Sequence, residues 1–172
     1  MTVLEIKEAA ERYLGITLPE DEVLFIVNEG LARFGDLGVV HAEAEVQAEA
    51  DVWYEMPEDL TSILQVRGPK GEIYLDYETR GSRIRFRHSG FFTVLARRMP
   101  EPVEAITDTP EVHPLLHRAL VSYLRGWVKV RDDDESQDGF RLLEQADQEA
   151  LRHYNTLMRR RWPHKIKVMR HA

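Results

Sequence analysis

The fold is decided by the stretch Leu116-His-Arg-Ala-Leu-Val-Ser-Tyr-Leu-Arg-Gly-Trp-Val-Lys-Val130, together with the acidic run Arg131-Asp-Asp-Asp-Glu135 and a second apolar repeat after it. Apolar side chains recur at helical spacing in both segments: Leu116, Leu120, Tyr123, Trp127 and Val130, then Phe140, Leu143, Ala146, Ala150, Tyr154 and Leu157. Such spacing is typical of amphipathic helices. Because the loop between them is short, we expect an antiparallel helical hairpin over about 110–161. Asp134 is expected to cap its second helix, with Gln137 completing a capping box.

Two shorter helices are predicted upstream, over 2–14 and 20–34. Thr2 and Glu5 have the spacing of a capping box at the start of the first, and Gly15 ends it. The second begins at Pro19 with acids in its first turn, an arrangement that favours helix initiation.

Residues 40–53 change to strict alternation, in which small apolar residues (Val or Ala) alternate with mostly acidic ones. A period of two gives a strand one apolar face and gives a helix none, so we expect a strand here. Four further strands are predicted, over 62–67, 73–77, 84–88 and 92–97. Glycine turns separate them, which favours an antiparallel meander. The sequence therefore predicts an α+β fold, a helical bundle with an inserted antiparallel β sub-domain at about 39–98.

Charge is distributed unevenly along the 172 residues. The net charge is −7, and no acid occurs after Glu149. Seven of the 23 Lys and Arg residues lie at 150–172, which leaves 16 against all 30 acids, a net charge of −14, in residues 1–149. Such asymmetry indicates an acidic body followed by a basic interaction tail. No apolar run is long enough to span a membrane, so no membrane partner is expected.

The segment after the hairpin is the strongest candidate for a binding site. We take residues 1–162 as one domain and 163–172 as an extended tail. Three interpretations fit this segment: a helix end with cations at its negative dipole end, phosphate binding with Trp162 stacking, or docking into a partner protein. In the third, Ile166-Lys-Val168 adds as an edge strand. The candidate binding residues are Arg159, Arg160, Arg161, Trp162, Lys165, Ile166, Lys167 and Val168.

Signals for chemistry are weak. His113 and His117 are four residues apart, but no Glu lies between them as a zinc-hydrolase helix requires. The loop beginning at Asp134 resembles a calcium loop, yet its twelfth position is Gln145 rather than a bidentate Glu. The chain has no cysteine, which excludes disulfides and thiolate catalysis. We therefore expect no enzyme, no cofactor and no metal.

The order of several motifs resembles the head–tail connector (adaptor) proteins of tailed bacteriophages. The segments that carry the resemblance are Val3–Glu8 with Leu14-Gly15, Glu22–Gly30, Tyr54–Leu60 with Ile63–Arg67, Ala96–Pro102, His113–Lys129, Asp132–Glu135 and Phe140–Tyr154. The long Ala and Glu alternation at 42–51 departs from the family pattern, in which more Thr and Val are expected.

The resemblance implies a virion structural protein at the head–tail interface, assembled in the host cytoplasm. Its subunits would form a homo-oligomeric, twelve-fold ring beneath the portal protein, extend the DNA channel and offer a docking face to tail or neck proteins. The C-terminal segment would be the arm that anchors to the portal. An acidic body suits a conduit for genomic DNA, because like charge keeps the genome from sticking.

The alternative is a small nucleic-acid-binding protein that uses the basic tail. We expect this less, because positive charge is concentrated after the fold ends and no basic helix face or aromatic-lined sheet is evident in the sequence.

Overall fold

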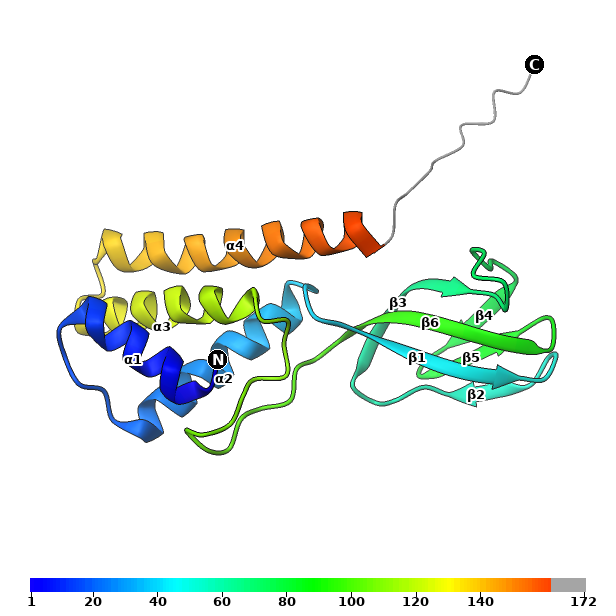
Figure 1. The fold of residues 1–172 in the computed structure, drawn as a ribbon, viewed down its shortest axis with the longest axis horizontal. Helices are drawn as coiled ribbons and strands as arrows, with labels where there is room; N and C mark the ends of the chain where they lie inside the picture. The colour runs from blue at the N-terminus through cyan, green and yellow to red at the C-terminus, as the bar shows by residue number, and fades with distance from the viewer. Residues whose placement is uncertain (162–172) are drawn as a thin grey trace, which may run out of the picture.

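The computed structural model describes residues 1–161, with side chains as far as Thr156, and confirms the α+β class. Figure 1 shows an elongated molecule with a helical lobe at one end and a β lobe (residues 41–98) at the other. Its elements are α1 Val3–Leu14, α2 Glu20–Asp36, β1 His41–Ala48, β2 Trp53–Glu55, β3 Leu60–Arg67, β4 Tyr77–Arg80, β5 Arg83–Phe86, β6 Gly90–Arg98, α3 Leu116–Asp132 and α4 Gln137–Arg161.

Helix α3 is the centre of the helical lobe. It packs against α1, α2 and α4, and its buried side therefore extends well beyond the single stripe that the sequence predicts. Leu116 and Leu120 are buried as expected, while Tyr123 is only partly buried. The additional buried residues lie between the expected ones: Ala119, Val121, Leu124 and Val128.

Two glycines bring α3 and α4 close together. A Cβ atom added to Gly126 would lie 2.9 Å from the backbone nitrogen of Leu143 and 3.0 Å from the carbonyl oxygen of Gly139. One added to Gly139 would lie 3.0 Å from the backbone nitrogen of Val130. Both positions are closed by backbone atoms, which cannot swing aside as a flexible side chain can. Figure 1 shows the two helices side by side along their length.

The start of α4 differs from the prediction. Ser136 precedes the helix, and its Oγ accepts a hydrogen bond from Gly139 N at 3.2 Å, so Ser136 and not Asp134 caps the helix. Phe140 was expected on the buried stripe but is 52% exposed. Ala146 and Ala150 are buried as predicted, and Leu142, which was not on the predicted stripe, is buried as well.

Helices α1 and α2 agree closely with the sequence prediction. The capping box of Thr2 and Glu5 is present in both directions, and Gly15 ends α1 with a left-handed φ of 72°. Helix α2 continues two residues past the expected end, to Asp36. Asn28 holds the connector after β6 with two hydrogen bonds, donating to Val103 O at 3.0 Å and accepting from Val103 N at 2.8 Å.

The β lobe contains two antiparallel three-stranded sheets, ordered β1-β6-β3 and β2-β5-β4, so the predicted simple meander is wrong. The first and last strands pair with each other because β6 returns the chain to the helical lobe beside β1. The expected strand at 73–77 is also wrong. Only Ile73 bridges to Arg67, and the strand that pairs with β5 begins at Tyr77.

Strand β1 spans His41–Ala48 and is therefore shorter than the predicted 40–53. Its alanines pair with residues of different size on β6: Ala42 lies opposite Ala96, and Ala48 lies opposite Gly90. Ala44 lies opposite Val94, and Val46 lies opposite Phe92, which stacks on Phe86 with ring centroids 4.2 Å apart. The small inward residues leave room for this aromatic core, and the acidic residues between them face outward.

The two lobes have separate cores and share few contacts. Arg98 fastens their junction through ion pairs with Asp59 at 2.7 Å, Glu101 at 3.1 Å and Glu111 at 3.2 Å. The ring of His41 at the start of β1 also meets Tyr154 of α4 edge-on, with centroids 6.1 Å apart.

Candidate protein-binding surfaces

The binding residues expected from the sequence lie almost entirely beyond the part of the chain that the structure describes. Arg159, Arg160 and Arg161 belong to the last turn of α4, but their side chains are not described. Trp162, Lys165, Ile166, Lys167 and Val168 lie outside the described residues. The tail hypothesis therefore stays a prediction.

A basic groove lies in the helical lobe, and the sequence analysis missed it. It is a cavity of about 470 Å³ between α1, α3 and α4. Three arginines line it, Arg118 and Arg125 from α3 and Arg152 from α4; these are the groove arginines. The expectation of no basic helix face is thus wrong. Arg118, Ser122 and Arg125 are separated by four and three residues, a spacing that places side chains on one face of a helix. The sequence therefore already contained the signal for this part of the groove.

Arg125 is the fixed member of the groove. Its Nη2 donates to the carbonyl oxygen of Ala9 at 2.7 Å, and its guanidinium lies 4.6 Å from the ring centroid of Tyr13. Burial lowers the pKa of Arg125, while Tyr13 and Glu149 act in the opposite direction. A guanidinium keeps its proton at neutral pH nevertheless. Arg125 therefore ties α3 to α1 and keeps a positive charge at the groove.

Among the side chains that the structure describes, none of the groove arginines forms an ion pair. The acid in the groove, Glu149, is engaged by neutral donors, Gln145 Nε2 at 2.7 Å and Ser122 Oγ at 3.4 Å. His153 adds a titratable group to the lining. The groove thus carries an excess of positive charge on a body that is strongly acidic overall.

An acidic loop lies at the turn between α3 and α4. Asp132 pairs with Arg131 at 2.6 Å, and the next three residues, Asp133, Asp134 and Glu135, are exposed. Asp133 Oδ1 accepts from Glu135 N at 3.1 Å, which fixes the turn. Across the described chain, none of the three exposed carboxylates forms an ion pair. The helical lobe therefore presents unpaired charges of opposite sign at two separate places.

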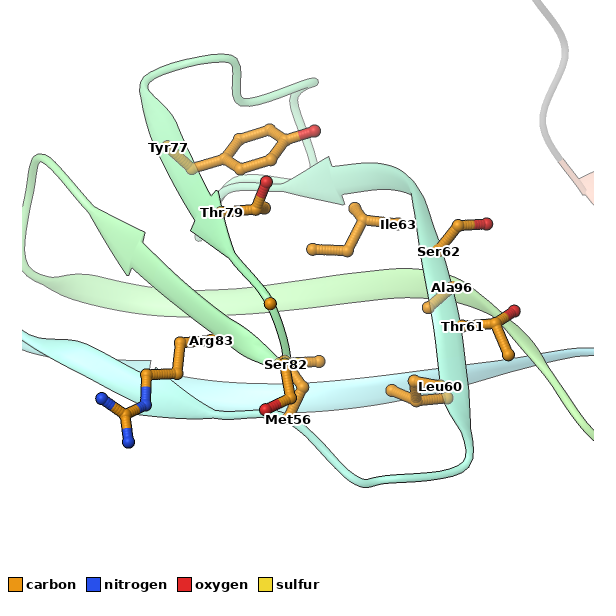
Figure 2. Close-up of a pocket in the computed structure, with 11 residues that line it drawn as sticks. Met56, Leu60, Thr61, Ser62, Ile63, Tyr77, Thr79, Ser82, Arg83 and Ala96 are labelled. Atoms are coloured by element: carbon orange, nitrogen blue, oxygen red, sulfur yellow. The ribbon is translucent and has the colours of Figure 1, made fainter.

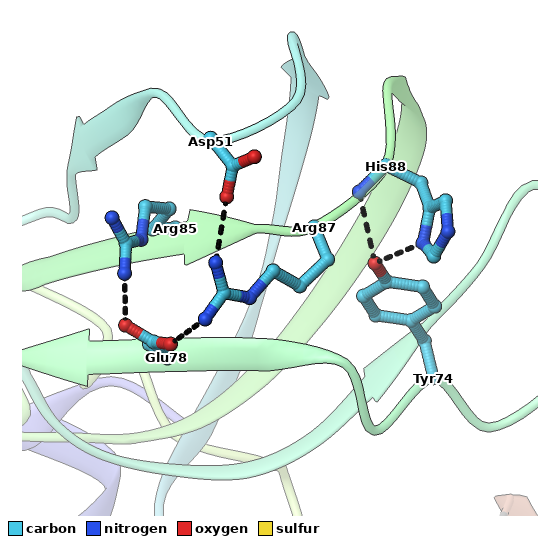
Figure 3. Close-up of polar contacts among 6 residues, drawn as sticks. All are labelled: Asp51, Tyr74, Glu78, Arg85, Arg87 and His88. Carbon is cyan, nitrogen blue, oxygen red and sulfur yellow. Dashed lines mark hydrogen bonds and ion pairs between the residues drawn. The ribbon is translucent and has the colours of Figure 1, made fainter.

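Three arginines of the β lobe are arranged differently, as Figure 3 shows for two of them. Arg83, Arg85 and Arg87 alternate along β5 and the residue after it; these are the β-lobe arginines. Glu78 pairs with both Arg85 and Arg87. Arg87 also pairs with Asp51 at 2.9 Å, and Arg83 with Glu55 at 2.5 Å. Arg85 lies over Trp53, 4.9 Å from its ring centroid. These cations are neutralised within the fold.

A smaller pocket opens between the edge strands β3 and β4 (Figure 2). It has a volume of about 290 Å³ and a mixed lining, with hydroxyls from Thr61, Ser62, Thr79 and Ser82 beside Leu60, Ile63 and Tyr77. Its charged lining residue, Arg83, is already paired with Glu55. The pocket thus offers a hydroxyl-rich and apolar surface but no ionisable pair.

His117 is a buried residue in the first turn of α3. Its side chain is 2% exposed, its Nε2 lies 3.2 Å from Pro110 O, and its Nδ1 lies 2.7 Å from the Met1 amine. Burial, followed by the nearby amine, lowers its pKa. His113 is exposed, and within residues 1–161 no three His, Cys, Asp or Glu side chains cluster closely enough to hold a metal ion.

The backbone after Asp134 does not have the form of a calcium-binding loop, because helix α4 begins at Gln137. Its third and later ligand positions fall at Asp138 and beyond, which already belong to α4. Asp138 is held by Lys129 at 2.5 Å and Arg141 at 2.6 Å. These hydrogen bonds lower the pKa of Asp138, with the Lys129 bond the larger cause.

Comparison with known proteins returns no family model that matches this chain, and no curated protein matches it. None of the helices within residues 1–161 is both long enough and apolar enough to cross a membrane.

Proposed function

We propose that the chain is a structural subunit of a virion, a head–tail connector that forms a ring beneath the portal, extends the DNA channel and presents a docking face to the tail. The proposal is a structural role without catalysis or cofactor. In it, residues 1–162 form one adaptor domain, a helical bundle with an inserted β sub-domain, and the segment from Arg159 to Val168 anchors to the portal.

The observation that carries the proposal is the pair of unlike charged surfaces on the helical lobe. A closed ring with one subunit type needs a heterologous interface, in which one patch meets a different patch of the neighbour. The basic groove and the acidic loop supply two such patches on one chain. The elongated, two-lobed shape supports the same role, because one lobe can form the ring while the other reaches toward a second partner (Figure 1).

The test is co-sedimentation with the ring of a candidate portal protein, sought among the neighbouring genes. Full-length chain is compared with a version that ends at Met158, which removes every expected anchoring residue. We expect stoichiometric binding of the full-length chain and loss of binding in the shortened one. If both bind, the body and not the tail docks. If neither binds at low salt, the connector proposal is wrong.

The groove also favours a second candidate function, binding of nucleic acid. Three arginines on one helix pair can contact phosphates, and such binding weakens steeply with salt. The test is titration of duplex and single-stranded DNA at two salt concentrations with wild type and with Arg118→Gln/Arg152→Gln. A loss of at least ten-fold in affinity in the variant would favour this role.

A further inference from the structure

The two unlike surfaces of the helical lobe are opposite in sign. The groove has three arginines, and the loop has three exposed acids without an ion pair, Asp133, Asp134 and Glu135, beside Asp132, which pairs with Arg131. Neither set forms an ion pair within the described part of the chain, although Glu149 lies in the groove with the arginines. By contrast, each of the β-lobe arginines has a carboxylate partner within the fold.

The loop does not pair with the groove arginines of its own chain, and it lies far from the Arg152 end of the groove. Helix α4 starts directly after the loop at Gln137, and the groove is lined by α4 residues as far along as Arg152 and His153. At 1.5 Å per residue the distance from the loop to Arg152 is roughly 24 Å along a continuous helix. The loop is also held as a tight turn by Ser136 N, which donates to Asp133 O at 3.0 Å.

We propose that the acidic loop Asp132–Glu135 of one copy binds in the basic groove of a second copy, with its free carboxylates against the groove arginines. The inference rests on the proposed ring, and it names the contact that would repeat around it. Each subunit uses its loop toward one neighbour and its groove toward the other. Such a head-to-tail contact is heterologous, so it continues from subunit to subunit until the ring closes.

A protein loop fits this groove better than a nucleic acid does. The groove holds its own carboxylate, Glu149, which already accepts hydrogen bonds from Ser122 and Gln145 and repels any incoming anion, so the distinction comes from the charge outside the groove. Residues 1–149 as a whole carry a net charge of −14, which repels a long polyanion that extends beyond the groove. A loop of three acids places its charge only where the arginines are.

The absence of cysteine allows a direct test by disulfide trapping. Glu135→Cys puts a thiol on the loop, and Gln145→Cys puts one at the groove. Mixed and oxidised, the two single-cysteine chains are expected to form far more of the mixed dimer than either forms alone, because disulfides need Cα atoms within about 7 Å. Lys70→Cys, on an exposed turn of the β lobe, is the control for random collision. A mixed yield no higher than this control would overturn the proposal.

Charge reversal tests the same contact from the other side. In the groove variant, Arg118→Glu/Arg152→Glu, and in the loop variant, Asp133→Lys/Asp134→Lys, all altered side chains are exposed, so the fold is expected to survive and is checked by circular dichroism. Each reversal, added to both cysteine chains, is expected to lower the trapped yield at least five-fold. When the groove reversal is placed on the Gln145→Cys chain and the loop reversal on the Glu135→Cys chain, the trapped contact is Glu against Lys and the yield returns.

The same charge complementarity applies to every contact around a full ring. In an equimolar mixture of the two reversed chains, alternating subunits make only attractive contacts, whereas each variant alone makes only repulsive ones. Failure of the mixture to restore the yield would overturn the proposal. The proposal would also be overturned if the groove reversal left disulfide trapping unchanged but abolished DNA binding. That result would assign the groove to nucleic acid. Portal co-sedimentation remains a separate readout, so failure of trapping with intact portal binding removes this contact and leaves the connector role.

Discussion

The β-lobe arginines and the groove arginines differ in whether they have carboxylate partners, although other arginines of the helical lobe, such as Arg33 and Arg141, are ion-paired. In the β lobe, each of the β-lobe arginines has a carboxylate partner within the fold, and Arg85 also stacks on Trp53. In the helical lobe, the groove arginines have no ion-pair partner among the described side chains. Paired charges complete a surface, whereas unpaired charges of one sign in a groove are available to another molecule. The contrast locates the candidate binding surface in the helical lobe.

The cores of the two lobes differ as well. The β lobe is closed by a few aromatic rings, with Phe86 stacked on Phe92 and Tyr74 next to Phe92 at 4.7 Å between centroids. The helical lobe has a larger core and is closed by backbone contact at Gly126 and Gly139. A small core depends on each ring, so we expect the β lobe to be the more sensitive to single truncations.

The largest effect is expected from Phe86→Ala in the β lobe. Phe86 is fully buried, and removing its ring leaves a cavity that costs about 3–5 kcal/mol of unfolding free energy. Urea unfolding followed by tryptophan fluorescence and by circular dichroism measures the loss and shows whether the helices unfold with the β lobe. Phe91→Ala is the matched control, since Phe91 is 50% exposed one position before Phe92. Equal losses in both variants would contradict the aromatic core as described.

Gly126→Ala tests how the helical lobe is closed. The added methyl meets backbone atoms of α4, so the helices must separate, which costs about 1–3 kcal/mol. Gly30→Ala is the control, because its methyl would meet side chains of Leu120 and Tyr123 at 3.0 Å, and these can shift. Thermal unfolding of both variants is expected to rank Gly126→Ala as the less stable. The reverse order would mean that the α3 and α4 contact tolerates separation.

The contrast between the arginine sets predicts unequal effects on stability. Glu78→Gln removes partners from Arg85 and Arg87 at once, and we expect a loss of about 0.5–1 kcal/mol that shrinks at high salt. Arg152→Gln removes a groove arginine without an ion pair among the described side chains, and we expect stability within about 0.5 kcal/mol of wild type. Urea unfolding at low and at high NaCl concentration measures the salt dependence of stability in each of the two variants. A salt-dependent loss in Arg152→Gln would reveal an intramolecular partner for the groove.

The sequence predicted elements whose signal is local and missed features that depend on contacts between elements. The capping box of Thr2 and the alternation of β1 are read directly from neighbouring residues. The pairing of β1 with β6 and the exposure of Phe140 depend on which surfaces meet, and no single segment contains that information.

The basic groove shows the same limit at the level of function. Arg118 and Arg125 have a visible helical spacing, but Arg152 joins them only because α3 and α4 run side by side at the close contact of their glycines. The run of arginines at 159–161 is prominent in the sequence for the opposite reason, because its members are consecutive. A contiguous cluster is therefore visible before the fold is known, whereas the groove exists only once the helices have packed.

The smallest expected effect is a pH dependence confined to the helical lobe. Burial lowers the pKa of His117 below its ordinary value of about 6.5, so as pH falls through that value the unfolded chain takes up a proton before the folded one does. The contribution of His117 to stability is therefore complete above about pH 6.5 and is lost progressively below it. His117→Gln cannot titrate, and its amide can still donate toward Pro110 O. Urea unfolding of wild type and variant is measured from about one pH unit below to one pH unit above the ordinary histidine pKa. The two unfolding free energies are expected to converge as the pH falls. Parallel curves would show that His117 is accessible to protons in the folded chain, and that the helical lobe is more open around α3 than its buried side chains indicate.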